Sequence, residues 1–262
     1  MVHQSLKIKM RGSDMGESET IWGEHLFHFE EIESTNKKAF EYAMLGAPTG
    51  TVVLADSQHG AYGRMGREWS APKGGLWFSI ILNQEKIMPA LPLLFGLWNA
   101  QFISSQLGVD CKLHWPNDLY VSGRKLAGIL IESNVDCSGK GFSIVGIGIN
   151  LLNRSAELDP EYNAISISDL TDEPLSRDWF LEDLLMHLQL NYETAVSRGF
   201  LFFRDDIEEL CPFIGNRVNV LSDGNIERIV TVNGIGDKGQ LLITEENGKS
   251  GELWNCIKVR PI

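Results

Sequence analysis

The sequence lacks long apolar runs and has few basic residues. No run approaches the ~20 apolar residues of a membrane-spanning helix, and residues 1–22 lack the apolar stretch and cleavage site of a secretory signal. We therefore expect a cytoplasmic protein with no membrane partner. Lys and Arg number 23 against 35 Asp and Glu, a formal net charge of −12, which argues against a general attraction to nucleic acid.

Cysteine is also scarce in the 262-residue chain. The four cysteines are far apart and form no CxxC pair: Cys111, Cys137, Cys211 and Cys256. This spacing indicates neither a zinc site nor a disulfide framework, so we expect reduced thiols that are mostly packed. The remaining composition, 43% hydrophobic and 22% charged residues, is that of an ordinary globular protein.

The order of hydrophobic patterns predicts an α+β fold in two domains. Residues 1–22 are polar without a sustained period and are expected to form a mobile leader. A larger domain over 23–211 and a small β-rich domain over 212–262 follow, with the boundary near Cys211. The expected strands cover 26–32, 51–55, 76–82, 112–115, 119–121, 126–133, 142–152, 217–221, 226–232, 240–244 and 252–259, and the expected helices cover 34–44, 89–107, 175–197 and 200–210.

A glycine-rich and arginine-rich loop lies between two of these strands, at residues 58–69. Three glycines alternate there with Arg64 and Arg67. Glycine lets a backbone approach an anion closely, and guanidinium presents planar donors to phosphate or carboxylate. The pattern therefore favours a loop that closes on a nucleotide, with a solvated turn as the alternative.

A second cluster is expected where two strands are joined by a turn at Ser122-Gly123. A hairpin at this turn would bring Lys125 back toward Asn117 and Asp118, so that an ammonium, an amide and a carboxylate share one face. The alternative is a solvated surface lysine.

The segment 146–150 places two glycines in a strand, followed by Asn150. A third glycine and a following helix are missing, which excludes a dinucleotide-binding fingerprint, and the P-loop pattern is absent as well. Glycines in a strand allow close approach of a backbone or a ligand. Asn150 is then a candidate to hydrogen-bond that ligand.

Taken together, these segments resemble those of the biotin protein ligases. The motifs stand in the family's order and spacing at residues 33–36, 58–69, 115–118, 125–128 and 146–150. The resemblance implies a mixed sheet with flanking helices and an SH3-like C-terminal domain. The short leader leaves no room for the winged-helix domain of the bifunctional repressors, so the chain is similar to the monofunctional type.

The resemblance also implies a two-step reaction. Biotin and ATP form biotinyl-5′-AMP with Mg²⁺ present, and a lysine of a biotin carboxyl carrier protein then accepts the biotin. By similarity, the catalytic residues are Lys125, Arg64 and Asp118. The implied biotin-binding residues are Ser34, Thr35, Asn36, Gln58, Tyr62, Gly63, Arg64 and Lys125, and those for ATP are Arg64, Arg67, Trp69, Asn117, Lys125 and Asn150. No residue is named as a metal ligand, and Trp77 either walls the biotin pocket or belongs to the core.

Two departures from the family pattern concern charge. The family loop usually has Gly-Arg where this chain has Ala61-Tyr62, and it usually has Lys where this chain has His114. Tyr62 is tolerable if the family arginine acts through its backbone amide. His114 would be fully charged only below about pH 6.5 unless a neighbour raises its pKa.

Two other functions remain open from the sequence. A lipoate ligase or octanoyltransferase would share the core, but neither is expected to carry the 115–118 motif together with the arginine loop. A protein that senses biotin or its adenylate without turnover is the other alternative. A homodimer paired through an edge strand of the sheet is also possible, and recognition of an acidic carrier domain would need a local patch.

Overall fold

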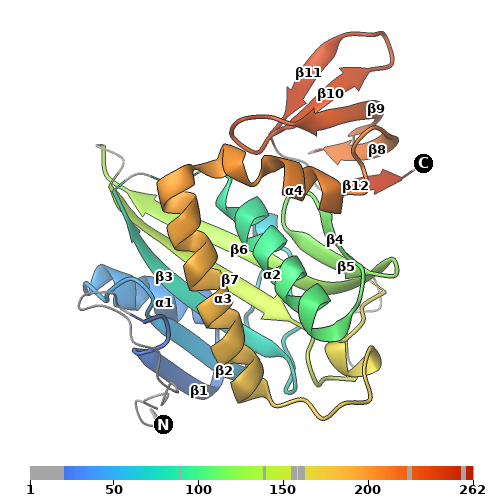
Figure 1. Ribbon diagram of the computed structural model, residues 1–262. Helices are drawn as coiled ribbons and strands as arrows, with labels where there is room; N and C mark the ends of the chain where they lie inside the picture. Colours follow the sequence, from blue (N-terminus) through green and yellow to red (C-terminus); the bar gives the residue numbers. More distant parts are fainter. Residues whose placement is uncertain are drawn as a thin grey trace.

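The computed structural model describes residues 21–85, 87–88, 90–137, 140–154, 158, 163–222, 226–254 and 258–261, and it folds into two sheets (Figure 1). Most of the predicted leader, residues 1–20, lies outside the described residues. Trp22, which we assigned to that leader, is 5% exposed and stacks on Phe95 at 6.4 Å between ring centroids. The ordered fold therefore begins before residue 23.

The larger sheet has seven strands in the order β1-β2-β3-β7-β6-β5-β4. Its first two strands are parallel and the other neighbours are antiparallel, which confirms the predicted mixed sheet. The strands are β1 (Leu26–Ile32), β2 (Val52–Gln58), β3 (Leu76–Gln84), β4 (Cys111–His114), β5 (Asp118–Val121), β6 (Arg124–Val135) and β7 (Gly141–Ile149).

Helices cover both faces of this sheet, because the central strands alternate apolar residues toward each side. Helices α2 (Leu91–Leu107) and α3 (Arg177–Arg198) cover one face (Figure 1). Phe78 and Ile80 belong to the hydrophobic core that includes residues of these helices. On the opposite face, Ile81 packs with the short helix α1 (Thr35–Met44). The face covered by α1 also carries the pocket described below.

The C-terminal part begins with two short helical segments where a single helix was predicted: η5 (Phe200–Phe202) and α4 (Arg204–Leu210). A five-stranded antiparallel sheet of the predicted SH3-like type follows, in the order β11-β10-β9-β8-β12. Its strands are β8 (Arg217–Ser222), β9 (Ile226–Ile235), β10 (Leu241–Glu245), β11 (Ser250–Leu253) and β12 (Lys258–Pro261). The single strand predicted over 252–259 is wrong, because β11 and β12 lie at opposite edges of this sheet.

The two sheets share one continuous hydrophobic core. Trp115, which follows β4, donates its indole N–H to the carbonyl oxygen of Gly239 at 2.9 Å. Ile235 donates its backbone N–H to Glu208 of α4 at 2.6 Å. The buried Trp115 bond therefore ties the C-terminal sheet to the larger sheet, and the partly buried Glu208 bond ties it to α4.

Three cysteines are free thiols: Cys111 and Cys211 are buried and Cys137 is exposed. The fourth, Cys256, lies outside the described residues. Burial raises the pKa of Cys111 to about 12 and that of Cys211 to about 11, so both stay protonated. Within the described part of the chain, no helix is both long and apolar enough to pass through a bilayer.

Candidate active site

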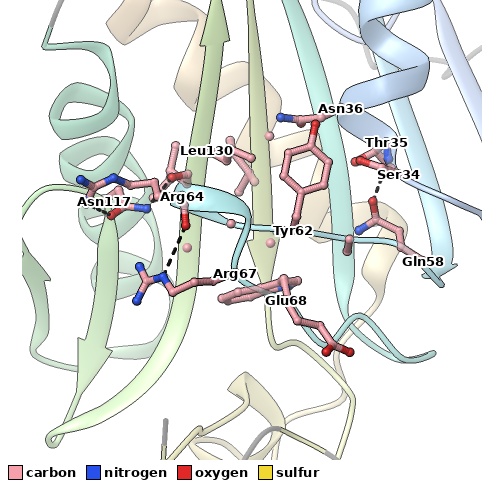
Figure 2. A pocket seen from close by; sticks show the side chains of 18 of the residues that line it. Ser34, Thr35, Asn36, Gln58, Tyr62, Arg64, Arg67, Glu68, Asn117 and Leu130 are labelled. Carbon is pink, nitrogen blue, oxygen red and sulfur yellow. Dashed lines mark hydrogen bonds between the residues drawn. The ribbon is translucent and has the colours of Figure 1, made fainter. Parts of the chain in front are cut away.

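A pocket opens on the α1 side of the larger sheet, between the N-terminus of α1, strands β6 and β7 and the loop that follows β2 (Figure 2). The structure brings nearly all of the predicted site residues to this one pocket. Those that line it are Ser34, Thr35, Asn36, Gln58, Tyr62, Gly63, Arg64, Arg67, Trp69, Asn117, Asp118 and Lys125.

One end of the pocket is neutral and polar. Ser34 caps α1, and its side chain accepts the backbone N–H of Lys37 at 3.5 Å, which is the usual role of serine at this position. The next residue, Thr35, donates its backbone N–H to Gln58 Oε1 at 2.7 Å. Because the Gln58 oxygen is used in this way, the two N–H donors of its amide nitrogen remain for a ligand.

Glycines on β6 and β7 make room for the side chains that form this pocket. A Cβ on Gly146 would lie 2.1 Å from Asn36 Oδ1, and one on Gly148 would lie 3.1 Å from the Trp69 indole nitrogen. Gly128 faces the same indole ring, at 3.2 Å. The glycines of β7 do allow a close approach, but the groups that approach are protein side chains and not the backbone or ligand that the sequence predicted.

The loop after β2 folds into a small hairpin over the pocket. Its arms are joined by a bridge between Tyr62 and Glu68 and by a hydrogen bond from Gly63 N to Arg67 O at 2.7 Å. Met65, at the tip, has φ +59°. Arg64 donates to Asn117 Oδ1 at 3.4 Å, across the pocket (Figure 2).

The predicted meeting of Lys125 with Asp118 is confirmed. The β5–β6 hairpin pairs these strands, and Lys125 Nζ lies 2.7 Å from Asp118 Oδ2. Lys125 is only 6% exposed, and its ammonium lies 5.0 Å from the ring centroid of Trp69. The pocket therefore contains a buried cation paired with a carboxylate. The alternative, a solvated surface lysine, is wrong.

Asn150 is the one predicted site residue that does not line this pocket. Its amide nitrogen donates to the backbone oxygens of Lys125, at 3.4 Å, and Ile165, at 3.1 Å. It faces an adjoining hollow that Trp69 and Lys125 also line. In the structure Asn150 therefore holds the backbone that carries Lys125, and its contact with a ligand stays a prediction.

Two aromatic neighbours have packing roles. Trp77 is fully buried, donates its indole N–H to the oxygen of Pro72 at 2.8 Å, and does not line the pocket, so its core interpretation is the correct one. His114 stacks on Tyr120 at 3.8 Å between ring centroids. Burial lowers the pKa of His114 to about 4, with a smaller contribution from the Lys125 charge. Asp118 opposes this shift only in part, so His114 becomes charged well below the pH of about 6.5 that marks its ordinary pKa.

Sequence reasoning missed Glu132. Its carboxylate accepts hydrogen bonds from Asn36 Nδ2 at 2.7 Å and from the Tyr62 hydroxyl at 2.9 Å. Burial, followed by the bond to Glu132, raises the pKa of Tyr62 to about 12. Strand periodicity was the available signal, because Glu132 follows Gly128 by four residues on β6 and shares its face.

Comparison with known proteins agrees with this geometry. The profile of the biotin/lipoate A/B protein ligase family matches residues 28–150. The bifunctional ligase/repressor BirA of Bacillus spizizenii is 32% identical over 236 residues, which cover 87% of this chain and 72% of the relative. The biotin–[acetyl-CoA-carboxylase] ligase of Paracoccus denitrificans is 28% identical, over 83% of this chain and 93% of the relative.

Solved structures give the same result. The biotin protein ligase from Aquifex aeolicus, in complex with biotin and ATP, superposes with a TM-score of 0.76 and 29% identity, covering 91% of this chain and 99% of that one. Fold, site motifs and sequence identity over most of the chain thus agree, and the chain belongs to the biotin protein ligase family.

Proposed function

We propose that this protein joins biotin to ATP as biotinyl-5′-AMP and then transfers the biotin to a lysine of a biotin carboxyl carrier protein. The proposal rests on one observation, which is that the two ends of one pocket differ in charge. Its neutral end offers hydroxyl and amide groups around Thr35 and Gln58, and its other end holds the buried ammonium of Lys125.

The two ends match the two ends of biotin. The ureido ring has a carbonyl acceptor and N–H donors, and the Gln58 amide nitrogen and the Thr35 hydroxyl are suited to these groups. With the ring at the Thr35 end, the chain of biotin runs past Tyr62 toward Arg64 (Figure 2). Its carboxylate then lies on the side of the pocket where the cations are.

The first step needs control of negative charge. An oxygen of the biotin carboxylate attacks the α-phosphorus of ATP, and the bond to the leaving pyrophosphate breaks. Lys125 offsets the repulsion between the two anions and stabilises the charge that develops in transfer. Arg64 and Arg67 hold the phosphates and the adenylate, and Trp69 lies beside the adenine.

Magnesium is expected to arrive with the nucleotide. Mg²⁺ keeps several waters and binds through phosphates with one or two carboxylates. Two carboxylates line the pocket, Glu68 and Asp118, and the second is already engaged by Lys125. No group of three or more potential ligand side chains occurs among the described residues. Such a pocket suits an ion held mainly by phosphate, which would supply further positive charge.

In the second step, an acceptor lysine attacks the carbonyl carbon of the mixed anhydride and AMP leaves. Asp118 is the carboxylate placed to orient Lys125 or to take a proton from the incoming amine. A biotin carboxyl carrier protein is the proposed acceptor. The name of the Paracoccus denitrificans relative gives acetyl-CoA-carboxylase as the protein on which that relative acts. This chain has a net charge of −12, so an acidic carrier is not attracted to it as a whole and would dock through a local patch. We propose that the reaction takes place in the cytoplasm.

Intact-mass spectrometry of a carrier domain tests the proposal. The domain is incubated with the protein, ATP, Mg²⁺ and biotin, and we expect a mass increase of one biotin that requires ATP. Lipoate in place of biotin is the control for the related ligases, and we expect it to give no adduct. If biotin binds tightly and several carriers remain unmodified, the protein is a sensor and the proposal is wrong.

A further inference from the structure

A groove lies between the start of α2, the loop after β4 and the C-terminal sheet, and it meets the active-site pocket at Arg64. The Arg64 side chain lines both the pocket and the groove. The chain also passes directly from one to the other, because residues 115–116 line the groove and residues 117–118 line the pocket. The groove therefore opens beside the place where the adenylate is proposed to form.

The C-terminal sheet supplies one wall of the groove, and this wall is held in place. It consists of residues 238–240, in the turn between β9 and β10, and of Trp254, which follows β11. Gly239 in this turn accepts the Trp115 indole N–H at 2.9 Å, and a Cβ added to Gly239 would lie 3.1 Å from Leu93 of α2. A wall fixed in this way loses little conformational entropy when a partner binds.

Trp254 presents a large aromatic side chain to the groove. It is 54% exposed, and its indole N–H donates to Glu252 Oε2 at 3.2 Å. The other oxygen of Glu252 accepts from the Gln240 amide at 3.3 Å, and Gln240 Oε1 accepts the backbone N–H of Lys238 at 3.0 Å. These hydrogen bonds connect Trp254 with Lys238. Tryptophan is one of the residues that contribute most to binding energy at protein interfaces.

The charged side chains that line the groove are both cationic, although the chain as a whole has a net charge of −12. They are Arg64 and Lys238. The carboxylate next to Lys238 in sequence, that of Asp237, is paired with Arg204 at 3.4 Å. Within the described part of the chain, Lys238 itself forms no ion pair. A local cationic patch of this kind favours an anionic partner.

We propose that this groove is the docking surface for the carrier domain in the second step, with Trp254 against an apolar part of the carrier and Lys238 against one of its carboxylates. The acceptor lysine belongs to a folded domain, so that domain must rest on the enzyme beside the pocket while the lysine reaches the adenylate. The inference rests on the proposed function and deepens it, because it identifies the local patch that an acidic carrier requires.

The triphosphate of ATP is the other anion that could lie beside Arg64. The lining of the groove favours a protein, because Pro92, Leu93 and Trp254 add apolar surface next to the cations. A polyphosphate has no apolar surface to bury against these side chains, whereas a protein partner has. Binding of the nucleotide in the groove is therefore an outcome that the test must distinguish.

The test measures biotin transfer at increasing concentrations of a biotin carboxyl carrier domain, with saturating biotin and ATP. Lys238→Glu and Trp254→Ala should each raise the KM for the carrier roughly tenfold. Pyrophosphate release in a single turnover precedes docking, so it should stay within about twofold of the wild-type rate. Added NaCl should raise the wild-type KM for the carrier and should have a smaller effect on Lys238→Met, which lacks the charge that salt screens.

Hydroxylamine in place of the carrier separates docking from chemistry. Its nitrogen attacks the carbonyl carbon of the mixed anhydride, the hydroxamate of biotin forms and AMP leaves. This small nucleophile needs no docking surface, so Lys238→Glu and Trp254→Ala should react with it at the wild-type rate.

Two matched variants make the same chemical changes away from the groove. Lys249→Glu reverses an exposed charge in the β10–β11 turn of the same sheet, and Trp179→Ala removes a tryptophan that is 49% exposed on α3. Neither residue lines the groove. Both variants should leave the KM for the carrier unchanged.

A KM for the carrier within about twofold of the wild-type value in both Lys238→Glu and Trp254→Ala overturns the inference while leaving the proposed function intact. A higher KM for ATP with slower pyrophosphate release and an unchanged KM for the carrier assigns the groove to the nucleotide, which also overturns it. Absence of biotin transfer by the wild-type protein to any carrier overturns the proposed function itself, and this inference with it.

Discussion

Replacing Lys125 by Met tests the charge on which the proposed chemistry depends. Methionine fills similar space without the ammonium. Lys125 is 6% exposed, so water does not readily replace its charge. Two unit charges 4 Å apart interact by about 4 kcal/mol at an effective dielectric constant of about 20. Loss of most of that interaction in the transition state slows adenylate formation by roughly 100- to 1000-fold.

The assay is pyrophosphate release with biotin and ATP, followed under single-turnover conditions. Biotin affinity without ATP, measured by calorimetry, should change less, because the neutral end of the pocket is untouched. Lys112→Met is the matched control. That lysine lies on strand β4, which β5 separates from β6 in the same sheet, and it pairs with Asp110 at 2.8 Å. Its side chain is 38% exposed, so its removal should leave the rate within about twofold.

A Lys125→Met protein that is folded and releases pyrophosphate within about fivefold of the wild-type rate would refute the role of this charge. An equal loss in Lys112→Met would instead show that the effect is not specific to the pocket. Thermal melting of both variants separates loss of folding from loss of chemistry.

Three further substitutions test the geometry. Gly146→Ala places a Cβ 2.1 Å from Asn36 Oδ1, so calorimetry should show biotin affinity reduced by roughly tenfold or more. Trp115→Phe leaves the oxygen of Gly239 without its 2.9 Å donor and should lower the free energy of unfolding in urea by about 2 kcal/mol. Burial lowers the pKa of His114 to about 4 from 6.5, so the unfolded chain binds more protons between these values and stability falls as the pH drops through them. In His114→Phe that fall should be smaller by roughly 1–2 kcal/mol after allowance for solvent screening, measured from urea curves at pH 7 and pH 4.5.

Local patterns in the sequence predicted most elements of the larger sheet. The bounds 26–32 of the first strand agree with the structure, and the helix capped by Ser34 begins and ends where its side chains predict. The errors lie near the C-terminus. There, 252–259 was taken as one strand, although β11 and β12 pair with different partners. Strand pairing is a long-range property, and hydrophobic alternation alone does not reveal it.

Some contacts in the pocket could likewise be predicted from the sequence, and others could not. The contact between Lys125 and Asp118 could be predicted from local sequence, because a tight turn joins their strands and only a few residues separate them. Glu132 escaped notice, since its partners Asn36 and Tyr62 stand 96 and 70 residues away. Strand periodicity places Glu132 on the same face as Gly128, but it does not reveal which distant side chains the carboxylate contacts.

The hydrogen-bond partners and the charge of buried groups become known only when the elements are packed. The tertiary structure holds His114 neutral by burying the ring against Tyr120, and it turns Asn150 toward the backbone of Lys125. These outcomes depend on which distant segments exclude water from a side chain and which donors they bring. Residue types and their spacing assemble the elements, but desolvation and hydrogen-bond direction arise only once those elements are packed together.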